Sequence, residues 1–105
     1  MKVLKFYERL NENTPEVGDY VIVDRQKEYR GDNDIYSFTS NNIGKIFSYG
    51  DNINYPYSVE FSDIPYNIKN NFYENRRNYR DYEILYCSKD KEELYKILQA
   101  KKFNL

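Results

Sequence analysis

The sequence predicts a single, mainly β domain that ends in a helix. Tyr20–Val23 and Ile43–Tyr49 are rich in β-branched and aromatic residues, which is typical of strands. Tyr55–Phe61 alternates apolar and polar side chains, as a strand with one buried face does. Near the end of the chain, apolar residues recur at the i, i+3, i+4 spacing of an amphipathic helix. The length of 105 residues fits one domain over residues 1–105.

Two further segments of the first half have weaker patterns. Val3–Leu10 alternates loosely and is interpreted as a short strand. Arg25–Ser40 is charged and has Gly, Asp and Asn at its middle, which is loop composition. We expect a long loop there, in which Tyr36 and Phe38 can pair briefly as a strand.

The second half begins with an unusual segment. Ser62–Tyr79 is rich in asparagine and aromatic residues and poor in aliphatic ones, so we expect an irregular or partly helical insert before the last strand. Tyr82–Cys87 returns to strand composition. From Ser88 the chain carries helix signals, because Asp90 and Glu93 have the spacing of a capping box. The apolar stripe of this helix, which predicts that it docks on the sheet, consists of Leu94, Ile97 and Leu98.

Composition excludes several classes of protein. The 16 basic and 17 acidic residues leave a net charge of −1, so the chain lacks the basic excess of many nucleic-acid-binding proteins. Charges within Met1–Leu10 interrupt any signal-peptide core, and no apolar run reaches the length of a membrane helix. The single cysteine forms no intrachain disulfide. We expect a cytoplasmic protein, in the host cytoplasm if the protein is viral, with no membrane contact.

The residue types needed for catalysis are scarce. The chain has no histidine, the side chain most used for proton transfer near neutral pH, so we expect no enzyme, no cofactor and no metal site. Asp81 and Glu83 share one face of a strand, but nothing else assembles around them. Cys87 lies among apolar neighbours and is interpreted as a buried structural thiol. The run Asp32–Asp34 resembles calcium ligands only faintly, because Ile35 follows where a calcium loop continues with acidic residues and glycine.

Three segments together carry a resemblance to a known fold. Val17–Val23 opens with Val-Gly-Asp, Asn42–Phe47 contains Gly44, and Tyr57–Phe61 alternates Tyr, Val and Phe. This series resembles the first three strands of SH3-like β-barrels, including KOW-type modules, Mind-bomb-type repeats and small bacterial and phage barrels. The resemblance implies a small barrel of about five strands, in which Gly44 marks a bulge or a close backbone approach. It implies little about function, because this barrel serves many roles.

Two segments supply candidate partner-binding residues. Aromatic and basic side chains, the types that concentrate in protein interfaces and that also stack on nucleic-acid bases, interleave before the last strand. These candidates are Tyr66, Lys69, Phe72, Tyr73, Arg76, Arg77, Tyr79 and Arg80. A second group lies in the long loop: Arg25, Tyr29, Arg30 and Tyr36. An alternative is that the aromatic side chains of these segments only pack on the barrel while the charges face water.

The leading hypothesis is a non-catalytic protein-binding module. The richness in Asn, Tyr, Lys and Ile also suits a phage or mobile-element accessory protein, such as an inhibitor of a host defence system. The alternative is an accessory barrel that binds RNA or DNA. A symmetric homodimer through exposed tyrosines and an edge strand is a further alternative.

Overall fold

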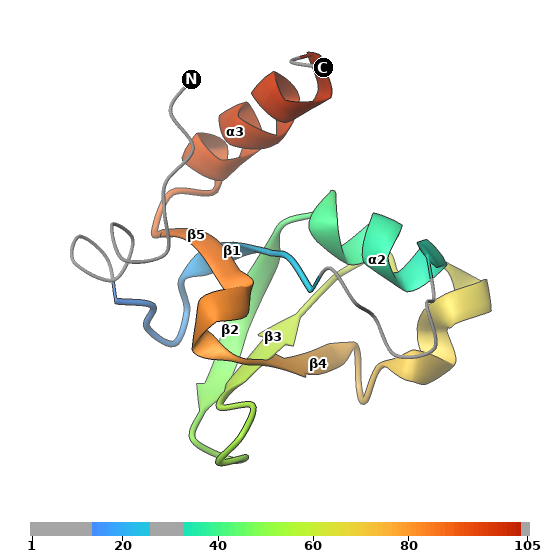
Figure 1. Cartoon of the computed structure of the whole chain (residues 1–105), viewed down its shortest axis with the longest axis vertical. Helices are drawn as coiled ribbons and strands as arrows, with labels where there is room; N and C mark the ends of the chain where they lie inside the picture. The colour runs from blue at the N-terminus through green and yellow to red at the C-terminus, as the bar shows by residue number, and fades with distance from the viewer. Residues whose placement is uncertain (1–13, 26–32, 104–105) are drawn as a thin grey trace.

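A computed structural model describes residues 14–25 and 33–103 of the chain (Figure 1). Five strands form one antiparallel sheet in the order β4-β3-β2-β1-β5. The strands are β1 (Tyr20–Val23), β2 (Gly44–Tyr49), β3 (Tyr57–Glu60), β4 (Arg76–Tyr79) and β5 (Ile84–Ser88). Two α-helices, α2 (Asn33–Ser40) and α3 (Lys91–Phe103), and two 3-10 turns, η2 (Tyr66–Asn71) and η3 (Asp81–Glu83), complete the described part. The prediction of a mainly β fold with a C-terminal helix is confirmed, whereas closure of the sheet into a barrel stays a prediction.

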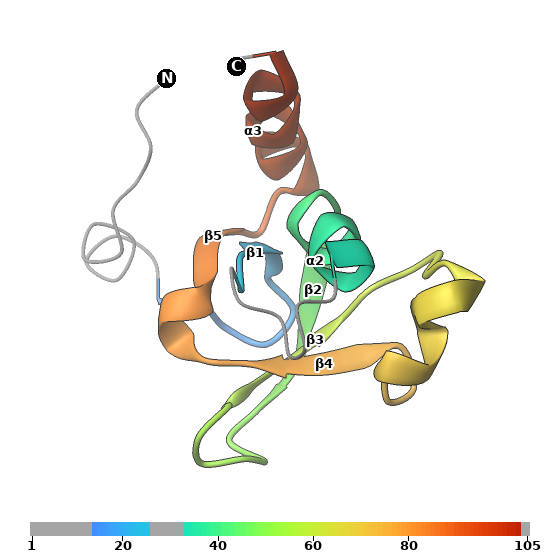
Figure 2. The ribbon, with the colours of Figure 1, turned by 45° about the vertical axis from the view of Figure 1, so that its right-hand side comes forward.

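The core has two parts on opposite faces of β1. Val21 and Val23 belong to the larger cluster, which includes Ile35 of α2 and residues of every strand. Ile22 points to the other face and packs with Leu94 and Leu98 of α3 in a smaller cluster. Because successive side chains of a strand alternate in direction, α2 and α3 cover opposite faces of the same strand (Figures 1 and 2). The predicted docking of the C-terminal helix is confirmed.

Gly44 lies where β2 packs closely against two core side chains. A Cβ atom at this position would lie 2.4 Å from Cγ1 of Val59 and 3.0 Å from the Phe61 ring. The close approach expected at Gly44 is therefore confirmed. The register between β2 and β3 also shifts between Ile46 and Ser48, so Phe47 occupies a β-bulge. The bulge lies three residues beyond Gly44, within β2.

The prediction of a loop or brief strand at Tyr36 and Phe38 is wrong, because both residues lie in α2. Asparagine and aspartate are typical of loops, but they are equally common at the start of helices, where they cap free backbone N–H groups. At the end of α2, side-chain amides donate hydrogen bonds to free backbone carbonyls. The side-chain amide of Asn41 donates to the Ser37 carbonyl (2.7 Å), and that of Asn42 donates to the Phe38 carbonyl (2.8 Å).

The insert before the last strand is only partly irregular. Tyr66–Asn71 forms η2, as expected of a partly helical segment, but Arg76–Tyr79 forms β4. The composition of β4 is poor for a strand, and its backbone is held by pairing with β3 along its whole length. A tight turn precedes β4, since Glu74 and Asn75 both have positive φ and Tyr73 exchanges two backbone hydrogen bonds with Arg76 (both 2.9 Å).

The last strand and helix agree with the prediction apart from their boundaries. Tyr82 and Glu83 belong to η3, so β5 begins at Ile84. Asp90 caps α3, because its carboxylate accepts the backbone N–H of Glu92 (2.9 Å). Glu93 accepts a hydrogen bond from the Ser88 hydroxyl (3.2 Å). The strand expected at Val3–Leu10 lies outside the described residues.

A buried carboxylate links the entry of β1 to the start of α3. Asp19 accepts hydrogen bonds from Lys89 Nζ (2.9 Å) and from the backbone N–H of Glu16 (3.0 Å). The hydrogen bond to Asp19, with the nearby charges of Asp19 and Glu16, raises the pKa of Lys89. The interaction stabilises the folded chain while Lys89 is protonated.

Candidate functional site

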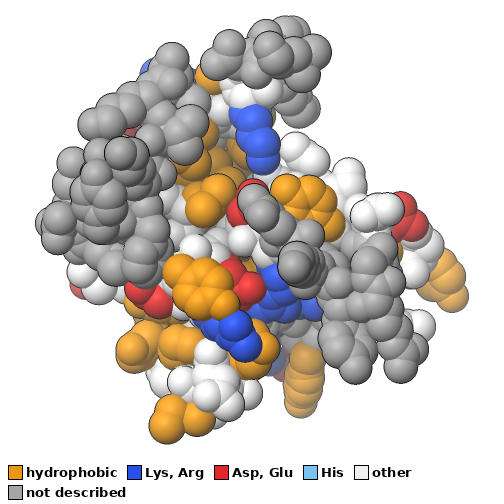
Figure 3. Space-filling model, in the orientation of Figure 1, with side chains coloured by type: hydrophobic (Ala, Val, Ile, Leu, Met, Phe, Trp, Pro, Cys, Tyr) orange, Lys and Arg blue, Asp and Glu red, His pale blue; other side chains and the backbone are white. Residues whose placement is uncertain are grey.

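The β2–β3 hairpin exposes apolar side chains at the end of the molecule opposite α3 (Figure 1). Ile53, at its tip, has 94% of its surface exposed, Tyr49 has 61% and Phe47 has 50%. Tyr73, before β4, has 68% exposed. On the face drawn in Figure 3, hydrophobic side chains gather at this end, with Lys or Arg side chains directly beside them. We call Phe47, Tyr49, Ile53 and Tyr73 the hairpin surface.

Arg76 of β4 joins two parts of the hairpin surface. Its guanidinium carbon lies 4.0 Å from the centre of the Phe47 ring and 5.7 Å from that of Tyr73. Arg76 also forms an ion pair with Glu74. A guanidinium stacked on an aromatic ring is weakly hydrated and rigid, and such pairs are common at the centre of protein interfaces.

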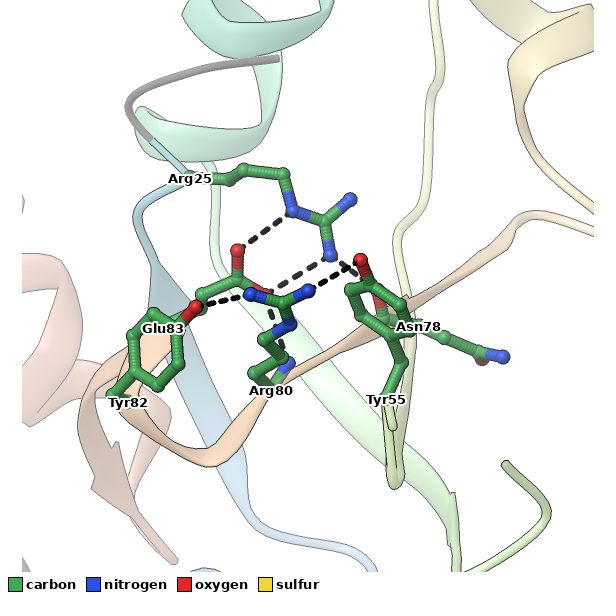
Figure 4. A network of polar contacts seen from close by, with 6 residues as sticks. All are labelled: Arg25, Tyr55, Asn78, Arg80, Tyr82 and Glu83. Atoms are coloured by element: carbon green, nitrogen blue, oxygen red, sulfur yellow. Dashed lines mark hydrogen bonds and ion pairs between the residues drawn. The ribbon is translucent and has the colours of Figure 1, made fainter. Parts of the chain in front are cut away.

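A second arginine–tyrosine cluster connects the hairpin to η3 (Figure 4). The guanidinium of Arg80 donates to the hydroxyl of Tyr55 (2.8 Å) and to that of Tyr82. The guanidinium carbon lies 4.6 Å from the centre of the Tyr55 ring. The hydrogen bond to Tyr82 raises the pKa of Arg80 further. Arg80 therefore remains a cation in this cluster throughout the physiological pH range.

Glu83 connects this cluster to Arg25. Its carboxylate is buried and accepts two hydrogen bonds from the Arg25 guanidinium, at 2.8 and 3.0 Å, and one from the backbone N–H of Arg80, at 2.8 Å. Arg25 Nη2 also donates to the Asn78 carbonyl of β4 (2.6 Å). Figure 4 shows Glu83 between the two arginines. This geometry holds Arg25 in one position and ties the end of β1 to β4 and η3.

A shallow hollow of about 280 Å³ opens beside Arg25. It is lined by Arg25, Asn52, Tyr55, Asn71, Tyr73, Arg77 and Asn78. Arg25 lies 5.4 Å from the centre of the Tyr55 ring, which forms part of the wall. We call this feature the arginine–asparagine hollow. Its wall consists of cationic, phenolic and amide side chains.

The structure distributes the predicted binding residues over several places. Phe72 and Tyr79 are buried in the core, so their side chains do not face a partner. Burial follows from the direct pairing of Tyr79 with Tyr57 and from the packing of Phe72 on Phe61, at 6.1 Å between ring centres. This position corrects the expectation that both residues contribute to an interface.

The remaining predicted residues that the structure describes lie in three places. Arg25, Tyr73, Arg76, Arg77 and Arg80 lie around the hairpin surface and the hollow. Tyr66 and Lys69 are exposed on η2, away from the hairpin. Tyr36 lies on α2, where its hydroxyl donates to Asp24 Oδ2 (3.4 Å), and burial together with the Asp24 charge raises its pKa. Tyr29 and Arg30 lie outside the described residues.

The sequence interpretation missed four residues of the hairpin. Phe47, Tyr49, Ile53 and Tyr55 were assigned to strands and turns, but they present their side chains at the surface or in the arginine–tyrosine cluster. Ile53 carried the clearest signal, because a branched apolar residue directly after Gly50–Asn52 stands at a turn tip, where no core can cover it. The bulge at Phe47 left no signal in the sequence.

Metal-binding groups do not assemble among the described residues. No cluster of three His, Cys, Asp or Glu side chains there has metal-binding geometry. Cys87 is buried on β5, as expected of a structural thiol. Within the described ranges, no helix is long and apolar enough to cross a membrane.

No protein-family model matches the chain, and no curated protein or solved structure matches it.

Proposed function

We propose that this chain is a non-catalytic protein-binding module whose contact surface is the hairpin surface with the adjoining arginines. One observation carries the proposal: Ile53, Tyr49 and Phe47 are exposed on a single hairpin that extends from the rest of the sheet. Contiguous exposed apolar side chains next to polar groups mark interaction sites. Tyrosine and arginine dominate the energetics of such sites.

The location of the basic residues favours a protein partner over a nucleic acid. In the register between β3 and β4, Arg76 lies opposite Glu60, which is exposed. Arg77 lies opposite Val59, which is fully buried. Because directly paired residues point to the same face, the two neighbouring arginines lie on opposite faces of β4. A continuous basic track, which a nucleic-acid backbone needs, is therefore interrupted.

Two more specific hypotheses about the module, its SH3-like family and its biological role, come from the sequence pattern. The sheet order and the long excursion between β1 and β2 support the SH3-like interpretation. The role of an accessory protein of a phage or mobile element that inhibits a host complex rests on composition alone. Both remain hypotheses, as do a cytoplasmic location and homodimer formation.

Site-specific photo-crosslinking tests the protein-binding function. A photoreactive phenylalanine analogue at position 53 is expected to capture a discrete protein from a bacterial lysate. The same analogue at position 95 is the control, since Tyr95 is also half-exposed but lies on α3, at the far end of the molecule. A partner captured at position 53 and not at position 95 supports the proposal. Equal capture at both positions, or none, contradicts it.

A second variant checks that the captured partner depends on the surface. Ile53→Glu places a charge at the tip and is expected to reduce recovery of the partner at least tenfold, because apolar anchors carry most interface energy. The matched control is Tyr66→Glu, which adds the same charge at another fully exposed position on η2. If both variants reduce recovery equally, the hairpin surface is not the contact site.

The nucleic-acid alternative has its own test. Binding of a single-stranded oligonucleotide should weaken steeply with salt and should be lost when Arg76, Arg77 and Arg80 are all replaced by Ala. Absent or salt-independent binding removes the alternative.

A further inference from the structure

The arginine–tyrosine cluster adjoins the tip of the hairpin surface. Tyr55 follows Ile53 by two residues, which span at most about 7 Å of chain. The Asn52 side chain accepts the backbone N–H of Tyr55 (3.0 Å), so Tyr55 is fixed relative to the turn. A partner that covers Ile53 therefore lies close to Tyr55 and to the Arg80 guanidinium, which donates to the Tyr55 hydroxyl (2.8 Å).

Arg80 has no carboxylate partner among the described residues. It differs in this from Arg25 and Arg76, because each of those is paired with a glutamate carboxylate. The side chain of Arg80 instead donates to two phenol hydroxyls, those of Tyr55 and Tyr82 (Figure 4). The hydroxyls of Tyr82 and Tyr55 raise the pKa of Arg80, and no carboxylate is among the groups that shift it. Because phenol hydroxyls carry no charge, they leave the positive charge of Arg80 unbalanced.

The cluster keeps hydrogen-bond donors for a ligand. The Arg80 guanidinium is partly exposed and has more N–H donors than its two hydrogen bonds to tyrosine use. The Tyr55 hydroxyl accepts one of these hydrogen bonds and retains its own O–H, which becomes a stronger donor when the oxygen accepts from a cation. The Tyr55 ring also lies 4.6 Å from the guanidinium carbon. Arg80 is thus held in position and needs little ordering when a ligand arrives.

The arginine–tyrosine cluster and the adjacent Arg25–Glu83 pair together carry one net positive charge. Arg25 and Glu83 neutralise each other through two hydrogen bonds (2.8 and 3.0 Å), so the charge of Arg80 remains. A single cation matches one carboxylate, whereas a polyanion such as a nucleic-acid backbone needs several cations for binding. Hydrogen bonds from a guanidinium to a carboxylate are also among the stronger ones in proteins.

We propose that the Arg80 guanidinium and the Tyr55 hydroxyl together bind the side-chain carboxylate of a Glu or Asp residue in the protein partner. The inference rests on the proposed protein-binding function and adds to it the chemistry of one contact. In the complex, one carboxylate oxygen accepts from an N–H group of Arg80 and the other accepts from the Tyr55 O–H. The partner thereby supplies the negative charge that balances Arg80.

A matched pair of small ligands tests this contact. N-acetylglutamate amide carries the carboxylate, and N-acetylglutamine amide is its neutral isostere. Each is titrated into the isotopically labelled full chain while NMR follows the Nε–H of Arg80, with the Nε–H of Arg76 as an internal reference. The proposal expects saturable shifts at Arg80 with the glutamate ligand. The glutamine ligand should bind about fivefold more weakly, the factor for unit charges roughly 4 Å apart in water.

Variants separate the contributions of the charge and of the hydroxyl, with binding followed at the backbone amide of residue 55. Arg80→Gln removes the unbalanced cation and should abolish saturable binding of the glutamate ligand. Lys96→Gln is its control, since it removes one positive charge from an exposed position on α3, at the far end of the molecule. Tyr55→Phe keeps the ring beside Arg80 but removes the hydroxyl, and should weaken the ligand about threefold or more, because one hydrogen bond to a charged group is lost.

The outcomes separate this inference from the function on which it rests. Equal binding of both ligands, no shifts at Arg80, equal shifts at Arg76, or unchanged binding in Arg80→Gln or Tyr55→Phe overturn the inference. Shifts at Arg80 with a single-stranded oligonucleotide but not with the glutamate ligand also overturn it, in favour of a phosphate backbone. If crosslinking at position 53 captures a protein while the glutamate ligand fails these tests, the protein-binding function stands and only the carboxylate contact is lost.

Discussion

The two ends of the molecule use similar side chains for opposite purposes. At the α3 end, Leu94 and Leu98 cover Ile22 and Tyr86 and exclude water. At the hairpin end, the side chains of Ile53, Tyr49 and Phe47 are half or more exposed to solvent. Apolar residues at the first end stabilise the fold, whereas those at the second are available to a partner. The difference predicts which substitutions change stability and which change binding.

The largest contrast is between Leu94 and Ile53. Leu94 has 1% of its surface exposed, so Leu94→Ala leaves a cavity and should lower the free energy of unfolding by about 2–5 kcal/mol. Ile53→Ala should change it by less than about 0.5 kcal/mol, because the side chain is already in water. Urea denaturation measures both values. A large loss in Ile53→Ala would show that the tip packs on the fold and is not free for a partner.

The two arginine–glutamate pairs give the next contrast. Glu83→Gln should lower the free energy of unfolding by about 2–3 kcal/mol, because Arg25 then faces a neutral group in a mostly buried position. Glu74→Gln weakens the pair with Arg76 at the surface and should cost less than about 1 kcal/mol. Equal effects in chemical denaturation would mean that the Arg25–Glu83 pair is as well hydrated as the surface pair.

Two glycines provide a smaller contrast along one hairpin. Gly44→Ala should destabilise the chain by about 1–3 kcal/mol, because its Cβ meets Val59 and Phe61. Gly50 has open space around it, so Gly50→Ala should cost only about 1 kcal/mol, from its φ of +95°. Thermal unfolding orders the two variants. If Gly50→Ala were the less stable variant, the close packing described at Gly44 would be contradicted.

The smallest effect is a loss of stability at alkaline pH. Tyr36 and Lys89 both have raised pKa values in the folded chain, so the folded state holds more protons than the unfolded state above about pH 10. The resulting stabilisation is complete below the unfolded pKa values and is lost as the pH rises through the folded ones. Urea midpoints at about pH 9 and about pH 11 measure the decline.

Tyr36→Phe isolates one contribution to this decline. The variant removes the titrating hydroxyl beside Asp24 and should make the decline shallower. Tyr66→Phe is the control, since Tyr66 is almost fully exposed. An unchanged slope in Tyr36→Phe would assign the alkaline decline to other groups.

Local patterns in the sequence were sufficient for the elements with strong periodicity. β1, β2, β3 and α3 follow from β-branched runs, alternation and the i, i+3, i+4 stripe, and Gly44 follows from glycine within a strand. The pattern failed where tertiary contacts override composition. β4 exists because β3 pairs with it, and α2 is short and begins with residues that also suit a loop.

The candidate site was only half accessible to sequence reasoning. Clustering of arginine and tyrosine indicated Arg76, Arg80 and Tyr73, because those residue types are chemically distinctive. Whether the other candidate residues face a partner depends on their burial, and burial depends on strand register. Tyr79 faces the core because it pairs with Tyr57, while Phe47 faces water because it alternates with the buried Ile46. Neither outcome can be read from composition.

The bulge at Phe47 has a consequence for how this surface can change over time. Ile46, before the bulge, belongs to the core, whereas the hairpin tip beyond Tyr49 contributes nothing to either core cluster. Pairs of residues can therefore be added to or removed from the tip without moving a core side chain to the wrong face. One scaffold can in this way carry tips of different length and chemistry, so a chain that must follow a changing target can diversify its contact surface without refolding its core.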